Sequence, residues 1–265
     1  MSAKGFCKKE ASKKQLQKYK NLAKILEDTE SLKCNGINGG NIIISAWNKN
    51  AQKIREISEE IYGIHLIESR LLMIAALADL QIVRAGIPGK TNEELGKILQ
   101  LTTIFWQGQF CTEQMISEGQ YIKAATVIKQ DIEIVTRIRE IKQGVAKDGK
   151  TPNVKYAPSM LHLHYADMND IAHISKPIWL DTLTSIKEET FTAVSVLHIF
   201  HEGISKNLYE IHLSVFYNII FETIDLFQKL YPEDTDIVLP ALKILTLVEE
   251  RLAKSGFTSN PSELT

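Results

Sequence analysis

The sequence predicts an all-α protein folded as a multi-helix bundle of eight or nine helices. Apolar residues recur three and four positions apart along most of the chain, which is the spacing of one buried helix face. The breaks between these segments fall at glycine, proline and asparagine. Only Ile42-Ile43-Ile44 has the β-branched character of a strand, and no partner strand of similar quality accompanies it. Because an isolated strand cannot satisfy its backbone, we place this run at the start of a helix.

Recognisable stops separate the expected helices. The stretch 35–41 consists of asparagines and glycines around one isoleucine, residues that tolerate positive φ, and it is predicted to be the clearest loop in the chain. Gly86 and Pro88 close the third helix, and Thr91 with Glu94 forms a capping box that opens the fourth. The predicted helices run over 8–28, 42–62, 64–85, 91–114, 120–142, 159–174, 185–203, 205–230 and 236–254.

The segment 120–142 gives the best-defined helix. Its apolar residues step by four, three, four and three, as one buried stripe requires. The stripe consists of Tyr121, Ala125, Ile128, Ile132 and Val135. The polar stretch 144–158 that follows is predicted to be a loop.

We expect a basic N-terminal helical arm over 1–34, a helical bundle domain over 42–255 and a short tail over 256–265. Residues 1–24 hold eight lysines and one acidic residue, so this segment carries +7 and the rest of the chain −8. Such an arm can bind nucleic-acid phosphates, or it can be a solvated helix face. The candidate phosphate contacts are Lys8, Lys9, Lys13 and Lys14.

Composition excludes several classes of protein. Three widely spaced cysteines without a CxxC pair favour neither a disulfide framework nor a structural zinc site. The N-terminus lacks the apolar run of a signal peptide, and the most apolar stretch, 71–78, is far shorter than the roughly 20 residues that span a bilayer. We therefore expect a cytoplasmic protein with no cofactor, no metal and no membrane contact.

Two motifs suggest chemistry, and each also has a purely structural interpretation. Gly89-Lys90-Thr91 resembles the end of a phosphate-binding loop, but Arg84 stands where its first glycine belongs and a helix precedes it. His198 and His201 could share a helix face and bind a metal, as in a histidine-lined hydrolase. His201 also extends an apolar stripe, which favours a core histidine.

The predicted helix 159–174 sorts its residues into two faces. The apolar face holds Leu161, Tyr165, Met168 and Ala172, and the adjacent stripe holds His162, Ala166, Asn169 and His173. Asn169 and His173 are one turn apart, whereas His162 lies about 16 Å from His173 along the axis. The pair can be a structural helix end with a capping histidine. Alternatively it can hold a histidine for proton transfer, since this residue type gains and loses a proton near neutral pH.

The run Met168-Asn169-Asp170-Ile171-Ala172-His173 resembles the signature of the HEPN superfamily, small helical domains of prokaryotic defence and toxin systems. Active members of that family are metal-independent RNases that use an arginine and a histidine at a dimer interface. Asn169 and His173 match the signature, and Met168 stands where the arginine belongs. The stretch 125–133 is similar to the preceding helix in some HEPN-like families, so the resemblance covers 119–177.

The resemblance implies binding more than cutting, because the missing arginine removes the cation that would stabilise a pentacovalent phosphate. Arg137 and Arg139 on the neighbouring helix are the candidates to replace it. We expect a HEPN-like homodimer that binds RNA or a partner protein in a prokaryotic defence or toxin–antitoxin setting. The alternatives are a helical scaffold without chemistry and a metal-independent RNase that uses His173 with Asn169.

Overall fold

The computed structural model describes residues 29–82, 84–174, 176–187, 192–234 and 236–256. It is 77% helical with 2% strand, which confirms the all-α class, and the described part contains seven α-helices. The helices are α2 (Thr29–Ile82), α3 (Glu93–Ser117), α4 (Tyr121–Lys142), α5 (Ser159–Ala172), α6 (Pro177–Thr184), α7 (Glu202–Leu230) and α8 (Leu239–Lys254). The shorter elements are the 3₁₀ turn η1 (Val154–Tyr156) and the strands β1 (Ser185–Lys187) and β2 (Thr192–Val194). The predicted helix 8–28 and its four candidate lysines lie outside the described residues.

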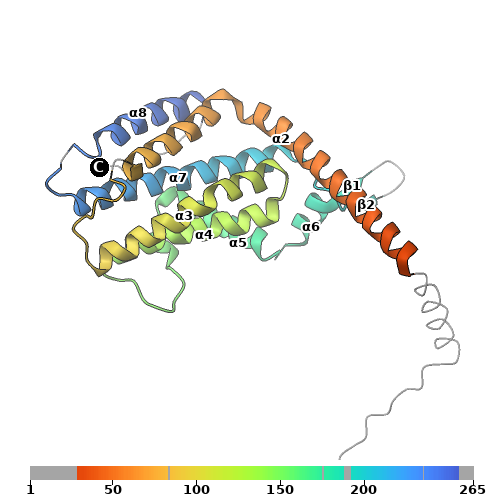
Figure 1. Cartoon of the computed structure of the whole chain (residues 1–265), viewed down its shortest axis with the longest axis horizontal. Coiled ribbons are helices and arrows are strands. Elements are labelled where there is room, and N and C mark those ends of the chain that lie inside the picture. The colour runs from red at the N-terminus through yellow and green to blue at the C-terminus, as the bar shows by residue number, and fades with distance from the viewer. Residues whose placement is uncertain (1–28, 83, 175, 188–191, 235, 257–265) are drawn as a thin grey trace, which may run out of the picture. The chain divides into compact units, whose positions relative to one another are not determined.

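The chain divides into two compact units, residues 1–49 and residues 50–265. In the first unit, residues 29–49 belong to α2 throughout, so the loop predicted over 35–41 is wrong (Figure 1). Gly36, Gly39 and Gly40 all have helical rather than positive φ, and a Cβ added at any of them would meet nothing within 4 Å. Glycine permits a left-handed turn but does not require one, and each costs a helix only about 1 kcal/mol relative to alanine.

The predicted break between the second and third helices is confirmed at Gly63. This residue has φ 72° and ψ 164°, a conformation outside the helical region, and it kinks α2. Only glycine adopts such a backbone without strain. The chain then continues as a helix to Ile82, and Gly86 with φ 77° follows.

The fourth predicted helix corresponds to α3, but its cap is Asn92 and not Thr91. The Asn92 side-chain oxygen accepts from the Leu95 backbone N–H at 2.8 Å, as an N-cap does. The Thr91 hydroxyl instead donates to the Asn92 carbonyl. At the other end Gly119 has φ 80° and turns the chain into α4, which confirms the predicted stop.

The core of the second unit lies among α3, α4, α5 and α7, which run alongside one another (Figure 1). All five residues of the predicted α4 stripe are buried. The helices α3 and α7 are antiparallel, because the Lys90 N–H before α3 donates to the carbonyl of Leu230 at the end of α7. Between them, the ring centroids of Phe105 and Phe216 are 5.5 Å apart. Tyr62 of α2 stacks on Tyr209 with 3.9 Å between ring centroids, which joins the second half of α2 to this core.

The helix predicted over 185–203 is wrong. Strand β1 pairs with β2 in an antiparallel hairpin, with Ile186 opposite Ala193, and α7 begins only at Glu202. The segment is rich in threonine, valine and isoleucine, whose branched Cβ atoms lose rotamer freedom in a helix and fit a pleated strand. The spacing of its apolar residues fits both a helix and a strand, so periodicity alone could not distinguish the two structures.

One described helix, α2 over Lys33–Ile82, is long and apolar enough to cross a membrane by length and composition. In its most apolar window 33% of the residues are buried inside the protein. A core helix of a soluble protein passes the same criterion, so this observation places the helix in neither environment.

Candidate functional site

The exposed stripe of α5 carries the residues that the sequence singles out. Leu161, Met168 and Ile171 are buried, whereas His162 and His173 are exposed and Asn169 is half-buried. The helix ends at Ala172, and His173 is its C-cap, with its backbone N–H donating to the Asn169 carbonyl at 3.0 Å. Of the predicted apolar face, Leu161 and Met168 are buried and Tyr165 and Ala172 are half-buried, and the His173 ring remains open to solvent.

A lysine from the neighbouring helix α4 meets this histidine. The Lys129 Nζ lies 3.4 Å from His173 Nε2, and it also lies 5.8 Å from the centroid of the Tyr165 ring. The Lys129 side chain is only 19% exposed, so its stem is held between the helices while its ammonium group reaches the surface. An ammonium group has no acceptor, so Lys129 donates and the imidazole nitrogen accepts in this contact.

A carboxylate behind Lys129 fixes this arrangement. Glu133, one turn along α4, accepts a hydrogen bond from the Tyr165 hydroxyl at 2.7 Å and lies 3.9 Å from Lys129 Nζ. Burial and the adjacent Glu133 carboxylate raise the pKa of the Tyr165 hydroxyl above its usual value, so the hydroxyl keeps its proton and remains a donor. The cluster of Lys129, Glu133, Tyr165 and His173, called the α4–α5 site below, thus joins two helices through polar contacts.

The backbone next to the α4–α5 site is strained. Ile174 has φ 51°, and among the described residues no other non-glycine residue has positive φ. A β-branched side chain in the left-handed region is unfavourable, and such strain persists only where the surrounding structure fixes it. The turn after His173 is therefore held in place at an energetic cost.

The structure also identifies which cation stands near His173. Met168 is buried in the core, so the position at which the HEPN signature has its arginine points away from the exposed stripe. Arg137 pairs with Glu140 and donates to loop carbonyls, and Arg139 pairs with Glu222 of α7 at 3.1 Å. The expectation that Arg137 or Arg139 replaces the arginine is not supported by these contacts. The cation next to His173 is Lys129.

The predicted metal alternative has no geometric basis. His198 and His201 precede α7 and lie outside any helix, because the expected helix there is a hairpin followed by irregular chain. The His201 backbone N–H donates to the Tyr121 hydroxyl at 3.1 Å, and the two rings pack 6.2 Å apart. Within the described ranges, no group of three or more His, Cys, Asp or Glu residues is arranged to hold a metal ion.

A second set of polar groups is buried where α3 and α7 face each other. Gln109 lies one turn after Phe105 on α3, and His212 lies one turn before Phe216 on the antiparallel α7, so these two side chains stand at the same level. Both are fully buried, and neither the Gln109 amide nor the two ring nitrogens of His212 have a hydrogen-bond partner among the described residues. Burial, assisted by the charge of Arg70, lowers the pKa of His212 to about 4.

Asp131 of α4 belongs to the same interior. It is 5% exposed and bonds to Thr112 of α3, while its Oδ2 has no partner in the described part of the chain. Burial raises the pKa of Asp131 to about 8, although the Thr112 hydrogen bond opposes the shift. A ligand in solvent cannot reach these buried groups, in contrast to the α4–α5 site. We therefore expect them to affect the free energy of unfolding.

The arrangement places a largely buried lysine side chain beside an exposed imidazole at the end of α5 in an all-α bundle. No protein-family model, no curated protein and no solved structure matches the chain.

Proposed function

We propose that the protein binds RNA through the α4–α5 site, where Lys129 and His173 contact a backbone phosphate. The observation that carries this proposal is the 3.4 Å approach of Lys129 Nζ to the exposed imidazole of His173. A phosphate oxygen can accept from both groups, and charge-assisted hydrogen bonds to phosphate are stronger than neutral ones. Asn169, one turn before His173, adds an amide on the same stripe.

The partial HEPN signature supports the same direction, since its two matching residues, Asn169 and His173, lie on the exposed stripe. Binding without cleavage is the favoured form of this proposal. The lysine cation is a single point donor, whereas an arginine presents a fork of donors that matches a phosphate in two places. A pentacovalent phosphate would therefore be stabilised less well here than in a site with the arginine.

The test is the affinity of the full chain for a single-stranded RNA, measured by fluorescence anisotropy over a series of salt concentrations. Lys129→Gln should weaken binding and reduce the salt slope by about 1, because one phosphate contact is lost. Lys123→Gln is the matched control. It removes the same charge from the same helix, but Lys123 is exposed and lies six residues earlier, about 9 Å along the axis and on a different side. Equal losses in both variants would refute a specific phosphate contact.

A second candidate function is metal-independent RNA cleavage by His173. The exposed ring with an adjacent cation favours it, because a histidine open to solvent can transfer protons to and from a ribose hydroxyl. RNA incubated with the protein in the presence of a chelator should then be cut, and His173→Ala should abolish the cutting. Cleavage that is absent, or unchanged in His173→Ala, removes this candidate.

Two sequence predictions stay with the proposal. The arm lysines Lys8, Lys9, Lys13 and Lys14 lie outside the described residues, and deletion of residues 1–24 should lower RNA affinity if they contact phosphates. A homodimer would carry two α4–α5 sites. Sedimentation velocity can establish whether the chain is a monomer or a dimer. A monomer without affinity for RNA would favour the remaining alternative, a helical scaffold or a protein that binds only another protein.

A further inference from the structure

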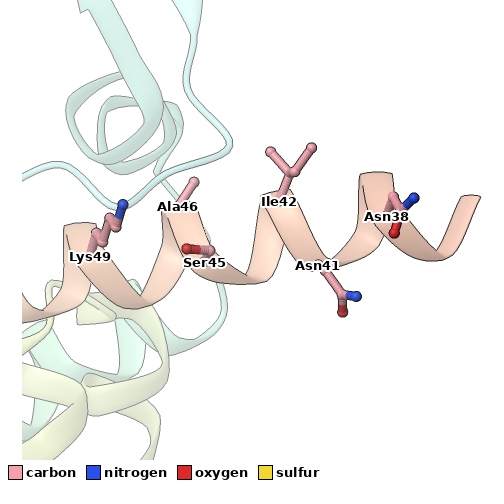
Figure 2. A pocket seen from close by; sticks show the side chains of 6 residues that line it. All are labelled: Asn38, Asn41, Ile42, Ser45, Ala46 and Lys49. Atoms are coloured by element: carbon pink, nitrogen blue, oxygen red, sulfur yellow. The ribbon is translucent and has the colours of Figure 1, made fainter. Parts of the chain in front are cut away.

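The described part of the first unit is one helical segment with an apolar side and a polar side. At 100° per residue, the larger apolar side chains over 36–47 fall with three glycines and an alanine in an arc of about 180°. These side chains are Ile37, Ile43, Ile44 and Trp47. The opposite arc carries Asn38, Asn41, Ser45, Asn48 and Lys49. Figure 2 shows much of this polar side, with Asn41 pointing away from Ile42. Ile42 is the exception among the isoleucines, because it lies beside Lys49 at the border of the polar arc.

No other part of the described chain covers the apolar arc. Ile43 is 51% exposed, Ile44 52% and Trp47 48%, and from 33 to 49 every described residue except Gly39 is exposed. Ile43 and Trp47 lie one turn apart with Ile44 beside them, and exposed large apolar side chains grouped on one helix face mark an interaction site in soluble proteins. The same segment contains three glycines, which weaken a helix, and a helix without tertiary packing is marginal in water. Its helical form is therefore best explained by an apolar environment that covers the arc.

The charge of the preceding chain indicates what this environment is. Residues 1–24 carry +7, which complements a surface of phosphate groups. RNA offers phosphates but no apolar surface for isoleucines, whereas an anionic bilayer offers both, with acyl chains directly beneath the headgroups. An arc of about 180° is also broader than the narrow seam of a two-helix dimer, and Gly36 and Gly40 would bury little area in such a seam.

From this combination we propose that residues 36–49 lie in the surface of an anionic membrane, parallel to its plane, with the arc of Ile43 and Trp47 buried at the headgroup boundary and the asparagines facing water. This is an interfacial helix and not a spanning one, and it departs from the expectation of no membrane contact that was drawn from the sequence. The inference uses none of the residues of the α4–α5 site and goes beyond the RNA-binding proposal.

The experiment is flotation of the full chain with vesicles of phosphatidylcholine alone or of phosphatidylcholine mixed with phosphatidylserine. The wild type should float with the anionic vesicles and much less with the neutral ones. Ile43→Asp should weaken binding at least about tenfold, because the free energy of burying one isoleucine corresponds to that factor or more. Asn41→Asp is the matched control: it adds the same charge two residues away on the polar arc and should retain most of the binding.

Several results would overturn the inference. Equal binding by Ile43→Asp and Asn41→Asp would show that the arc is not in contact with lipid. Equal flotation with neutral and anionic vesicles would show that the lysines of residues 1–24 do not contribute to membrane binding. A wild-type dimer that Ile43→Asp converts to a monomer, without any flotation, would identify a second copy of the chain as the occupant. Flotation abolished by RNA at low concentration would assign the lysine-rich segment to nucleic acid.

Discussion

Two buried ionisable groups of the second unit, His212 and Asp131, should oppose each other in the pH dependence of stability. The pKa of His212 is lowered to about 4 from 6.5, so the unfolded chain binds the proton first and stability falls as the pH drops through that window. The pKa of Asp131 is raised to about 8 from 3.8, so the folded chain holds the extra proton and stability falls as the pH rises. Each group contributes a slope of about 1.4 kcal/mol per pH unit, with opposite signs.

In the wild type the two slopes cancel between pH 4 and 6.5, where the windows overlap. Asp131→Asn removes the falling slope, so relative to the wild type its free energy of unfolding should rise with pH by about 1.4 kcal/mol per unit, a total of roughly 3 kcal/mol across the overlap. His212→Leu, a change of similar volume, should show the reverse, a decline relative to the wild type as pH increases. The contributions of surface groups are shared by all three proteins and cancel in these differences.

The assay is urea unfolding followed by far-UV circular dichroism at intervals of pH for the wild type and both variants. The difference curves should slope in opposite directions, and their sum should be nearly flat over the overlap. If both variants run parallel to the wild type, then His212 and Asp131 do not titrate differently in the folded and unfolded chains. That result would refute the reasoning from burial.

Substitutions test three other local features of the fold, each by the same unfolding assay. Ile174→Gly should raise the free energy of unfolding by roughly 0.5 kcal/mol, because relief of the left-handed strain outweighs the entropy that glycine adds to the unfolded chain; a loss of more than about 1 kcal/mol would contradict that strain. Gly119→Ala should cost roughly 2 kcal/mol, since φ is 80° and the new Cβ would lie 3.2 Å from the His198 Cβ. Gly144→Ala, also at positive φ but with nothing within 4 Å, should cost less; equal costs would show that the contact is unimportant. Ile132→Ala should cost about 3 kcal/mol through the cavity it leaves, and a cost under about 1 kcal/mol would place this side chain outside the core.

Local patterns could be predicted from the sequence wherever one physical cause dominates. The buried stripe of α4 from Tyr121 to Val135 could be predicted, because five apolar residues at this spacing share a face only when the backbone is helical. Gly63 and Gly119 marked real breaks because positive φ favours glycine there. The stretch 35–41 misled the prediction, since the same residue types also occur in a helix, and nothing in a sequence shows which backbone they adopt.

Tertiary relations were beyond reach of the sequence. Lys129 and His173 are 44 residues apart, and only the packing of α4 against α5 brings them to 3.4 Å. The spacing of Lys129 and Glu133 was visible, but it is equally typical of a surface ion pair. His212 and Gln109 were missed because polar residues within a helix are usually taken to be exposed.

The contact of RNA with His173 can be observed directly through the ring signals of the histidines in ¹⁵N-labelled protein. On α5, His162 and His173 are both exposed, but only His173 adjoins Lys129. Titration with a single-stranded RNA should shift the ring signals of His173 and leave those of His162 nearly unchanged, and Lys129→Gln should reduce the shift. Equal shifts of both histidines, or an unshifted His173 while RNA is bound, would contradict the proposal that the α4–α5 site holds the phosphate.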